Sequence, residues 1–292
     1  MPELPDIEAY STAIARVAGG RRLQHLRIGH PFLLRSFDPK PAAFEGRMLE
    51  GARRLGKRVV LVFDANHFAV IHLMIAGRLH WRDATRTGKV ANQLAEFEFE
   101  NGRIILTEAG TKRRASLHLV AGEAALREHD PGGLEPLDCD VDEFCAALKR
   151  ESHTLKRALT DPKVLSGIGN AYSDEILHRA RLSPLQLTVN LDNHEIKQLH
   201  AAMQGVLVHW RERLTAESRN GFPEKVTAFR PEFAVHGKFG APCLDCGAPV
   251  QRIVYTENEC NYCARCQTGG KLLADRALSR LLKASWPKTL DG

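Results

Sequence analysis

The sequence predicts an α+β protein with two domains, in which a strand-rich first half precedes a helical second half. Three observations predict it. Apolar and polar residues alternate within residues 21–125, apolar residues recur at helical spacing beyond residue 136, and two Cys-x2-Cys pairs lie near the end of the chain. At 292 residues the chain is long enough to bury two modest cores, so two domains are the natural expectation.

A helix is expected close to the start of the chain. Four apolar residues recur there at spacings of three and four: Ile7, Tyr10, Ile14 and Val17. This spacing places them on one helical face. Pro5 suits the first turn, where no N–H donor is needed, and Gly19-Gly20 predicts the end of the helix.

Residues 21–125 read as β-strands. The clearest signal is a hairpin, in which Phe97 and Phe99 alternate with glutamates before an Asn101-Gly102 turn. The runs 58–63 and 68–73 supply further strands. Alternation buries one face and leaves the other in water, so we expect a β-sandwich with the glutamates on the wet face.

The second half reads as helical. A Pro-, Gly- and acid-rich passage, residues 130–136, predicts a linker between domains. Beyond it, an apolar stripe from Ile196 to Leu214 predicts a core-facing helix. Residues 216–228 predict a loop, and residues 272–282 a short amphipathic helix.

Cysteine spacing near the end of the chain indicates a metal site. The two pairs are Cys243, Cys246, Cys263 and Cys266. Residues 247–262 between them are enough for a β-hairpin, which suits a site with four thiolates around zinc. Cys260 has the same spacing from Cys263 and offers a competing pair, so spacing alone leaves the ligand set open. Cys139 and Cys145 are isolated and are expected to be packing residues.

Bulk properties narrow the class of protein. The net charge is +6 and the pI about 9.0, which favours a polyanionic partner. The sequence contains no run of 18 apolar residues, so no membrane-spanning helix is predicted. The start of the chain does not resemble a secretory signal. Cysteines at metal-ligand spacing rather than disulfide spacing favour a reducing cytoplasm.

The opening run Met1-Pro2-Glu3-Leu4-Pro5 carries a chemical possibility. If Met1 is removed, Pro2 becomes a secondary amine, and α-amino groups have a pKa of about 7.7–8.0, so part of it is unprotonated near neutral pH. Such an amine can attack a sugar aldehyde to form an iminium, with Glu3 moving protons beside it. The plain alternative is that Pro2 only begins the chain and Glu3 is a surface residue.

Four blocks together resemble the formamidopyrimidine-DNA glycosylase and endonuclease VIII family of base-excision repair enzymes. The Pro2-Glu3 start is one block, and residues 53–57 are similar to the family's Gly-Lys turn. Residues 156–161 with 167–175 resemble its helix-two-turn-helix, and residues 233–243 with 263–267 resemble the two ends of its zinc finger. The blocks span residues 2 to 267 in the family's order.

The resemblance implies a DNA glycosylase with an abasic-site lyase activity. Pro2 would attack C1′, Glu3 would exchange protons with the opening sugar, and Lys57 would bind the 3′ side and assist β-elimination. Lys156 and Asn170 would contact phosphates that flank the lesion.

The resemblance also implies one structural zinc ion, held by Cys243, Cys246, Cys263 and Cys266 with Cys260 outside the site. The expected partner is double-stranded DNA that contains a damaged base, expected to be oxidised, or an abasic site. We expect a monomer without a membrane partner.

The chain departs from the family's pattern at four places, of which Asp6 in place of the usual glutamate is the mildest. Asn258 stands where the zinc hairpin usually carries an arginine that grips a phosphate and donates a proton in δ-elimination, and Arg252 lies six residues away. The family's methionine that fills the gap left by the flipped base appears as Ile75. The family's Asp-Pro-Arg-Arg-Phe-Gly segment is missing, and Arg113 in its place either contacts DNA or lies in a solvated loop. The opposite-base rule of the family therefore cannot be assumed.

These patterns predict four segments. Residues 1–127 would form the catalytic β-sandwich, 128–230 the helix-two-turn-helix domain, 231–270 the zinc finger, and 271–292 a C-terminal helical extension. The main alternative is a non-catalytic protein that binds damaged DNA on the same fold. A zinc-ribbon module that binds RNA would explain the cysteines and the charge, but not Pro2, Glu3 and Lys57.

Overall fold

The computed structural model describes the chain except residues 87, 89, 111, 225, 228, 257, 275–279, 283–284, 286 and 291–292. The fold is α+β, as the sequence predicts, and forms two compact units. The first comprises residues 1–131 and 210–227, and the second residues 132–209 and 228–292. The helices and the cysteine hairpin of the second half therefore fold as one unit.

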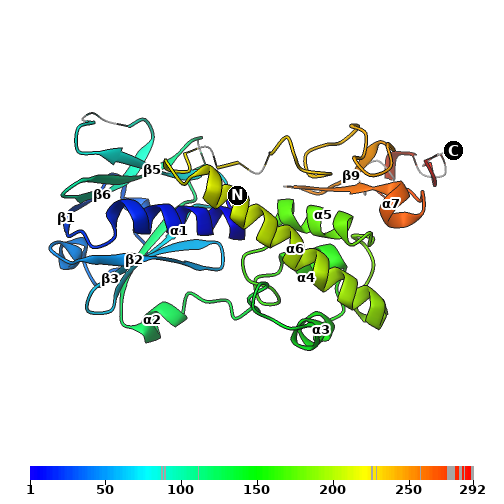
Figure 1. The fold of residues 1–292 in the computed structure, drawn as a ribbon, viewed down its shortest axis with the longest axis horizontal. Helices are drawn as coiled ribbons and strands as arrows, with labels where there is room; N and C mark the ends of the chain where they lie inside the picture. Colours follow the sequence, from blue (N-terminus) through cyan, green and yellow to red (C-terminus); the bar gives the residue numbers. More distant parts are fainter. Residues whose placement is uncertain are drawn as a thin grey trace. The chain divides into compact units, whose positions relative to one another are not determined.

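The first unit is a sandwich of two antiparallel four-stranded sheets (Figure 1). One sheet has the order β1-β6-β7-β5, and the other β2-β3-β4-β8. The strands are β1 Leu23–Ile28, β2 Leu49–Leu55, β3 Arg58–Phe63, β4 His67–His72, β5 Gly77–Asp83, β6 Gln93–Phe99, β7 Gly102–Glu108 and β8 Ser116–Ala121.

Helix α1, Leu4–Ala18, packs against β2 and β3. Its apolar face meets the inner faces of the sheets, where Ile7, Leu61 and Phe97 are fully buried. Gly19 ends the helix, as its sequence predicts. A short helix, α2 Glu123–Arg127, covers the outer face of β4 and β8 with a smaller apolar cluster.

The expectation of a wet outer face is wrong for Glu96, which is only 4% exposed. Its carboxylate accepts hydrogen bonds from Arg27 at 2.8 Å, Gln93 at 3.1 Å and Arg103 at 3.2 Å. The strand alternation is correct, but neighbouring long polar side chains cover this glutamate. Burial of a carboxylate is tolerated when charged partners satisfy it.

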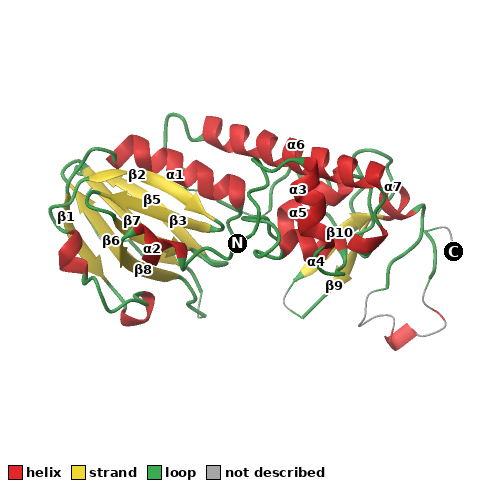
Figure 2. Cartoon of the chain, turned by 90° about the horizontal axis from the view of Figure 1, so that it is seen from below, coloured by secondary structure: helices red, strands yellow, loops and turns green. Residues whose placement is uncertain are grey.

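The second unit contains α3 Val141–Lys149, α4 Leu155–Thr160, α5 Asn170–Arg179 and most of α6 Asn193–Glu217. Its hairpin joins β9, Val250–Val254, to β10, Glu259–Cys263, and α7, Ala264–Thr268, follows directly. Figure 2 shows the hairpin beside α5, and β10 packs against that helix. The apolar stripe of α6 is buried, as predicted, except that Val206 is half-buried.

Residues 216–228 and 272–282 differ in part from their predicted structure. The segment predicted as a loop over 216–228 is irregular beyond Glu217, but Val226 is only 5% exposed and packs into the core of the sandwich with Phe222. The helix predicted over 272–282 falls partly outside the described residues. Residues 272–274 are irregular, and residues 280–282 are helical.

Candidate nucleic-acid interface and metal centre

The N-terminus of α1 holds the predicted nucleophile and its acid. Pro2 is buried, and Glu3, the N-cap residue, is 2% exposed. The backbone N–H of Glu3 donates to the carboxylate of Asp6 at 3.0 Å, which fixes the backbone at the start of the helix. Asp6, which the sequence analysis did not single out as a site residue, therefore positions Glu3.

The α-amino group of Met1, one residue before Pro2, lies among charged groups. Its pKa lies below the usual 8.0, mainly because burial penalises the cation. The carboxylates of Glu3 and Asp6 oppose this effect, whereas the nearby cations Arg78 and Lys57 add to it. The structure thus brings Glu3 and Lys57 into the electrostatic neighbourhood of the N-terminus.

Lys57 lies in the two-residue turn between β2 and β3. Gly56, the other turn residue, has φ of +59°, a backbone conformation that favours glycine. Arg54 donates to the Gly56 carbonyl at 3.3 Å and to the carboxylate of Glu8 in α1 at 3.2 Å. These contacts hold the Lys57 turn against the helix that carries Glu3.

Histidines beside this turn are a feature that sequence reasoning missed. His72 is paired with Arg58 across β3 and β4. Burial, followed by the charges of Arg58 and Lys57, lowers the pKa of His72 to about 4. Burial also lowers the pKa of His118 to about 4, with the adjacent His129 as the next cause. Both rings are therefore neutral at physiological pH. In the sequence, His72 is marked only by its place in the strand run 68–73, three residues before Ile75. His118 carries no comparable signal.

Two further predicted contacts lie on loops of the sandwich. Ile75 is 60% exposed between β4 and β5. Arg113 is exposed in the loop after β7. The buried carboxylate of Glu108 anchors that loop by accepting the backbone N–H groups of Arg114 and Ala115 at 2.9–3.1 Å. Residue 111 of the loop lies outside the described residues.

In the second unit, Asn170 is the first residue of α5. Gly167 precedes it with φ of +82°, so the backbone turns sharply into the helix. The Asn170 side chain donates to the Glu259 carbonyl of β10 at 2.8 Å. The start of α5 is therefore tied directly to the cysteine hairpin.

Lys156 points inward rather than into solvent. It is 8% exposed, and its Nζ lies 2.5 Å from the carboxylate of Asp174 and 2.7 Å from the Asn170 carbonyl. Asp174 also accepts from His236 Nδ1 at 2.7 Å and from the Asn261 backbone N–H at 3.1 Å. This cluster joins α4, α5, β10 and the segment around His236 that precedes Cys243.

Glu175 makes a second connection between α5 and the cysteine-bearing segment. Its carboxylate accepts the backbone N–H groups of Ala234, Val235 and His236 at 2.8–3.0 Å. Burial raises the pKa of Glu175, and these three hydrogen bonds oppose the rise. Sequence reasoning placed Glu175 in the helix-two-turn-helix block but assigned it no partner.

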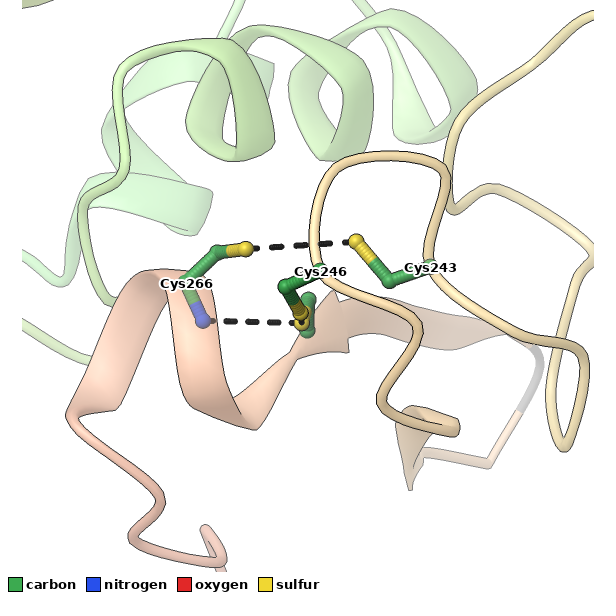
Figure 3. A group of neighbouring side chains, drawn as sticks. Cys243, Cys246 and Cys266 are labelled. Carbon is green, nitrogen blue, oxygen red and sulfur yellow. Dashed lines mark hydrogen bonds between the residues drawn. The ribbon is translucent and has the colours of Figure 1, made fainter.

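Four cysteines converge at the base of the hairpin: Cys243, Cys246, Cys263 and Cys266. All four sulfur atoms lie within 4.8 Å of one another, with Cys246 and Cys263 3.4 Å apart. Figure 3 shows the sulfur of Cys243 facing that of Cys266, which is 3.9 Å away, with Cys246 beside them. Cys260 lies apart from this group. It is fully buried, and burial, followed by the nearby Asp174, raises the pKa of its thiol well above 9.

His178 of α5 borders the four-cysteine cluster. Its Nε2 lies 3.3 Å from the Cys243 sulfur. Burial lowers the pKa of His178, and the carboxylate of Asp245 opposes that shift. Groups that hydrogen-bond to metal ligands from outside the ligand set orient those ligands, and His178 is placed to do so for Cys243.

The tip of the hairpin carries Asn258, which is exposed and accepts the Tyr255 N–H at its carbonyl, 2.8 Å away. Arg252 lies on β9 opposite Asn261. Its guanidinium stacks 4.3 Å from the centre of the Phe239 ring. Asn258 thus offers a neutral side chain at the tip, and Arg252 lies farther down the hairpin.

Sequence comparisons match both units. The Formamidopyrimidine-DNA glycosylase N-terminal domain matches residues 1–115, and the Formamidopyrimidine-DNA glycosylase H2TH domain matches residues 133–213. A formamidopyrimidine-DNA glycosylase of Heliobacterium modesticaldum is 31% identical over 283 residues, which are 91% of this chain and 100% of the relative. A formamidopyrimidine-DNA glycosylase-like protein of Mycobacterium tuberculosis is 40% identical over 152 residues, 52% of this chain and 94% of that protein.

Solved structures share the fold. The Lactococcus lactis Fpg in complex with DNA that contains N7-benzyl-Fapy-dG has a TM-score of 0.82 and 22% identity, covering 91% of this chain and 100% of that one. The same enzyme with abasic-site DNA has a TM-score of 0.80 and 21% identity, covering 91% and 99%. Among the described residues, no helix is both long and apolar enough to cross a bilayer. Together, the two domain matches and the full-length relative show that the chain belongs to the formamidopyrimidine-DNA glycosylase family.

Proposed function

We propose that this protein is a base-excision repair DNA glycosylase with abasic-site lyase activity, and that Pro2 is its nucleophile. The observation that carries the proposal is the N-terminus itself. The Met1 amino group, one residue before Pro2, has a pKa lowered by burial, and Glu3 and Lys57 act on it electrostatically. A desolvated amine beside a carboxylate and a lysine is what iminium chemistry needs near neutral pH.

The chemistry follows from these groups once Met1 is removed. The Pro2 nitrogen attacks C1′ of the sugar and displaces the damaged base, or condenses with an abasic aldehyde and releases water. After displacement of a base, the C1′–O4′ bond of the sugar ring breaks while Glu3 donates a proton to O4′, and the C1′–N bond becomes an iminium. The iminium withdraws electrons from C2′, which loses a proton, and the C3′–O bond breaks to release the 3′ phosphate. Glu3 exchanges protons with the sugar, and the Lys57 ammonium stabilises the leaving phosphate.

The partner is double-stranded DNA with a damaged base, expected to be oxidised, or with an abasic site. Extrusion of a base requires a few kcal/mol, which weak pairing at damage reduces. Lys57, Asn170, Arg113 and Asn258 are the proposed DNA contacts. Lys156 contributes indirectly, because its ammonium holds the Asn170 carbonyl and Asp174. We expect a monomer that acts in the cytoplasm.

The four-cysteine cluster fits one structural Zn²⁺. Tetrahedral zinc with bonds of about 2.3 Å to sulfur requires sulfur atoms about 3.8 Å apart, and the measured separations are 3.9 and 3.4 Å. Cys243, Cys246, Cys263 and Cys266 would hold the ion, and its four thiolates leave no open position for chemistry. Cys260 remains a neutral thiol outside the site.

Borohydride trapping on a duplex with one abasic site tests the proposal. An enzyme that forms an iminium is reduced to a stable covalent adduct, whereas a protein that only binds damaged DNA shifts the duplex without an adduct. Duplexes with different oxidised bases, each opposite all four partners, extend the assay to lesion preference. Tight binding of abasic DNA with no adduct would favour the non-catalytic alternative.

A further inference from the structure

Arg252 is held in an unusual way for a surface cation. Its guanidinium lies 4.3 Å from the centre of the Phe239 ring, and that ring is itself 52% exposed. The Arg252 side chain is 42% exposed. The ring supports one face of the guanidinium, so the planar group is oriented in advance while part of it remains in contact with water.

The carboxylate of Glu259 faces this cation within the hairpin. Glu259 Oε2 lies 3.4 Å from Arg252 Nη1, which is long for a charge-assisted hydrogen bond. The other oxygen, Oε1, accepts from the Asn261 amide at 3.1 Å. Asn261 is 1% exposed, and its own oxygen accepts the Gly237 N–H at 2.7 Å. A buried amide therefore fixes the carboxylate, and Arg252 is the more loosely held partner.

The same glutamate connects Arg252 to the start of α5. The Glu259 carbonyl accepts the Asn170 side chain at 2.8 Å, while the Glu259 carboxylate faces Arg252. Arg252 is therefore two contacts away from the helix start that we propose as a phosphate site. Asn258, which is exposed at the hairpin tip, is neutral and cannot form an ion pair with a phosphate.

We propose that Arg252 is the phosphate-binding cation of this hairpin and that Glu259 restrains it. When DNA binds, Arg252 would exchange its ion pair with Glu259 for one with a backbone phosphate. Phe239 would keep the plane of the guanidinium oriented. The carboxylate stays in place on Asn261 and lowers affinity by competing with the phosphate. The inference rests on the proposed function, since it takes DNA as the partner.

Binding as a function of salt tests the assignment. The dissociation constant is measured on a duplex with a tetrahydrofuran abasic analogue, which the lyase cannot cleave. Loss of one phosphate contact reduces the slope of log Kd against log salt by about 0.9. Arg252→Met keeps an apolar stem over Phe239 and should show this reduction. Lys197→Met, which removes an exposed charge from α6 of the same unit, is the matched control and should leave the slope unchanged.

Glu259→Gln separates restraint from structure. Glutamine can still accept from Asn261 but no longer competes with phosphate, so binding should tighten severalfold at low salt. Weakened binding in Glu259→Gln, or an unchanged salt slope in Arg252→Met, would overturn the assignment. Zinc content, measured for each variant, shows that the hairpin is intact.

Trapping with borohydride keeps this test apart from the proposed activity. At saturating protein and low salt, Arg252→Met should still give the wild-type yield of covalent adduct, because Arg252 does not touch the iminium. A wild-type protein that gives no adduct would contradict the proposed activity, and the salt slopes would still decide the role of Arg252.

Discussion

The side-chain amide of Asn170 donates to the Glu259 main-chain carbonyl at 2.8 Å, which joins the first residue of α5 to the second strand of the hairpin. One turn farther along α5, the carboxylates of Asp174 and Glu175 accept backbone N–H groups of β10 and of the segment 234–236. The proposed phosphate contacts at Asn170 and on the hairpin are thus set by one connected network within the second unit.

The N-terminal amine can be tested by blocking it. A protein with a peptide tag before Met1 should give no borohydride adduct, because Pro2 then lies within a peptide bond, yet it should still bind abasic DNA. Proteolytic removal of the tag and Met1, which leaves Pro2 first, should restore the adduct in the same preparation. Undiminished trapping by the blocked protein would indicate a lysine nucleophile, with Lys57 the first candidate.

The metal site makes a prediction about cysteines. Cys260→Ser should retain one zinc per chain, because Cys260 lies apart from the four clustered sulfur atoms. Cys266→Ser, the matched change inside the cluster, should lose zinc and unfold the hairpin. Metal analysis of the purified proteins measures both. Loss of zinc from Cys260→Ser would show that the ligand set includes this residue.

Asn258 predicts the incision product. A neutral amide cannot supply the proton for a second elimination, so the wild-type protein should accumulate the β-elimination product on abasic DNA. Asn258→Arg should raise both the share of δ-product and the DNA affinity, and the gain in affinity should shrink with salt. Asn258→Gln, a neutral control, should change neither. The measurement is a gel that resolves the β- and δ-elimination products. If wild type and Arg252→Ala both gave mainly δ-product, this interpretation of Asn258 would lose its support.

Lys156 separates a buried role from a direct DNA contact. Removal of one partner from a buried ion pair costs about 3–5 kcal/mol, and Asp174 is fully buried. Lys156→Met should therefore lower the free energy of unfolding by about 3 kcal/mol. The loss is expected at the lower end of this range because His236 remains as a partner of Asp174. Lys163→Met, the same charge change at an exposed site, should have little effect in urea unfolding. Unchanged stability with weaker DNA binding would instead assign Lys156 to a phosphate.

The histidines beside the Lys57 turn predict a pH dependence of stability. The pKa values of His72 and His118 are about 4 in the folded protein, whereas an unfolded histidine has a pKa of about 6.5. Between these values the unfolded chain binds more protons, so unfolding takes up protons and stability decreases as pH falls. The double variant with glutamine at both positions should show a shallower decrease between neutral pH and about pH 5 in urea titrations. Equal decreases in the two proteins would contradict these pKa shifts.

Local patterns predicted the elements, and their success has a physical reason. Residues that fix α1 and the β6–β7 hairpin are neighbours in sequence, so spacing and turn chemistry report them directly. A cluster of cysteines was also predictable, because two short pairs with a hairpin between them suit four thiolates around one metal ion. Spacing alone did not separate Cys260 from this cluster, and the family resemblance did.

Contacts between distant segments were not predictable in this way. Lys156 looks like a surface cation in the sequence, because nothing nearby announces its partner Asp174, 18 residues later. Arg27 and Glu96 lie 69 residues apart and meet only because β1 pairs with β6. Side-chain partners of this kind follow from the fold and not from local periodicity.

The burial of Pro2 and Glu3 has a consequence for how the enzyme matures. A peptidase must draw the Met1–Pro2 bond into its own active site in an extended form, and in the folded protein Pro2 is buried at the start of α1. Because Pro2 is buried and Met1 only half-exposed, we expect the bond to be more accessible before that helix docks on the sheet. We therefore expect Met1 to be removed during synthesis, so that each molecule gains or loses its nucleophile before it folds.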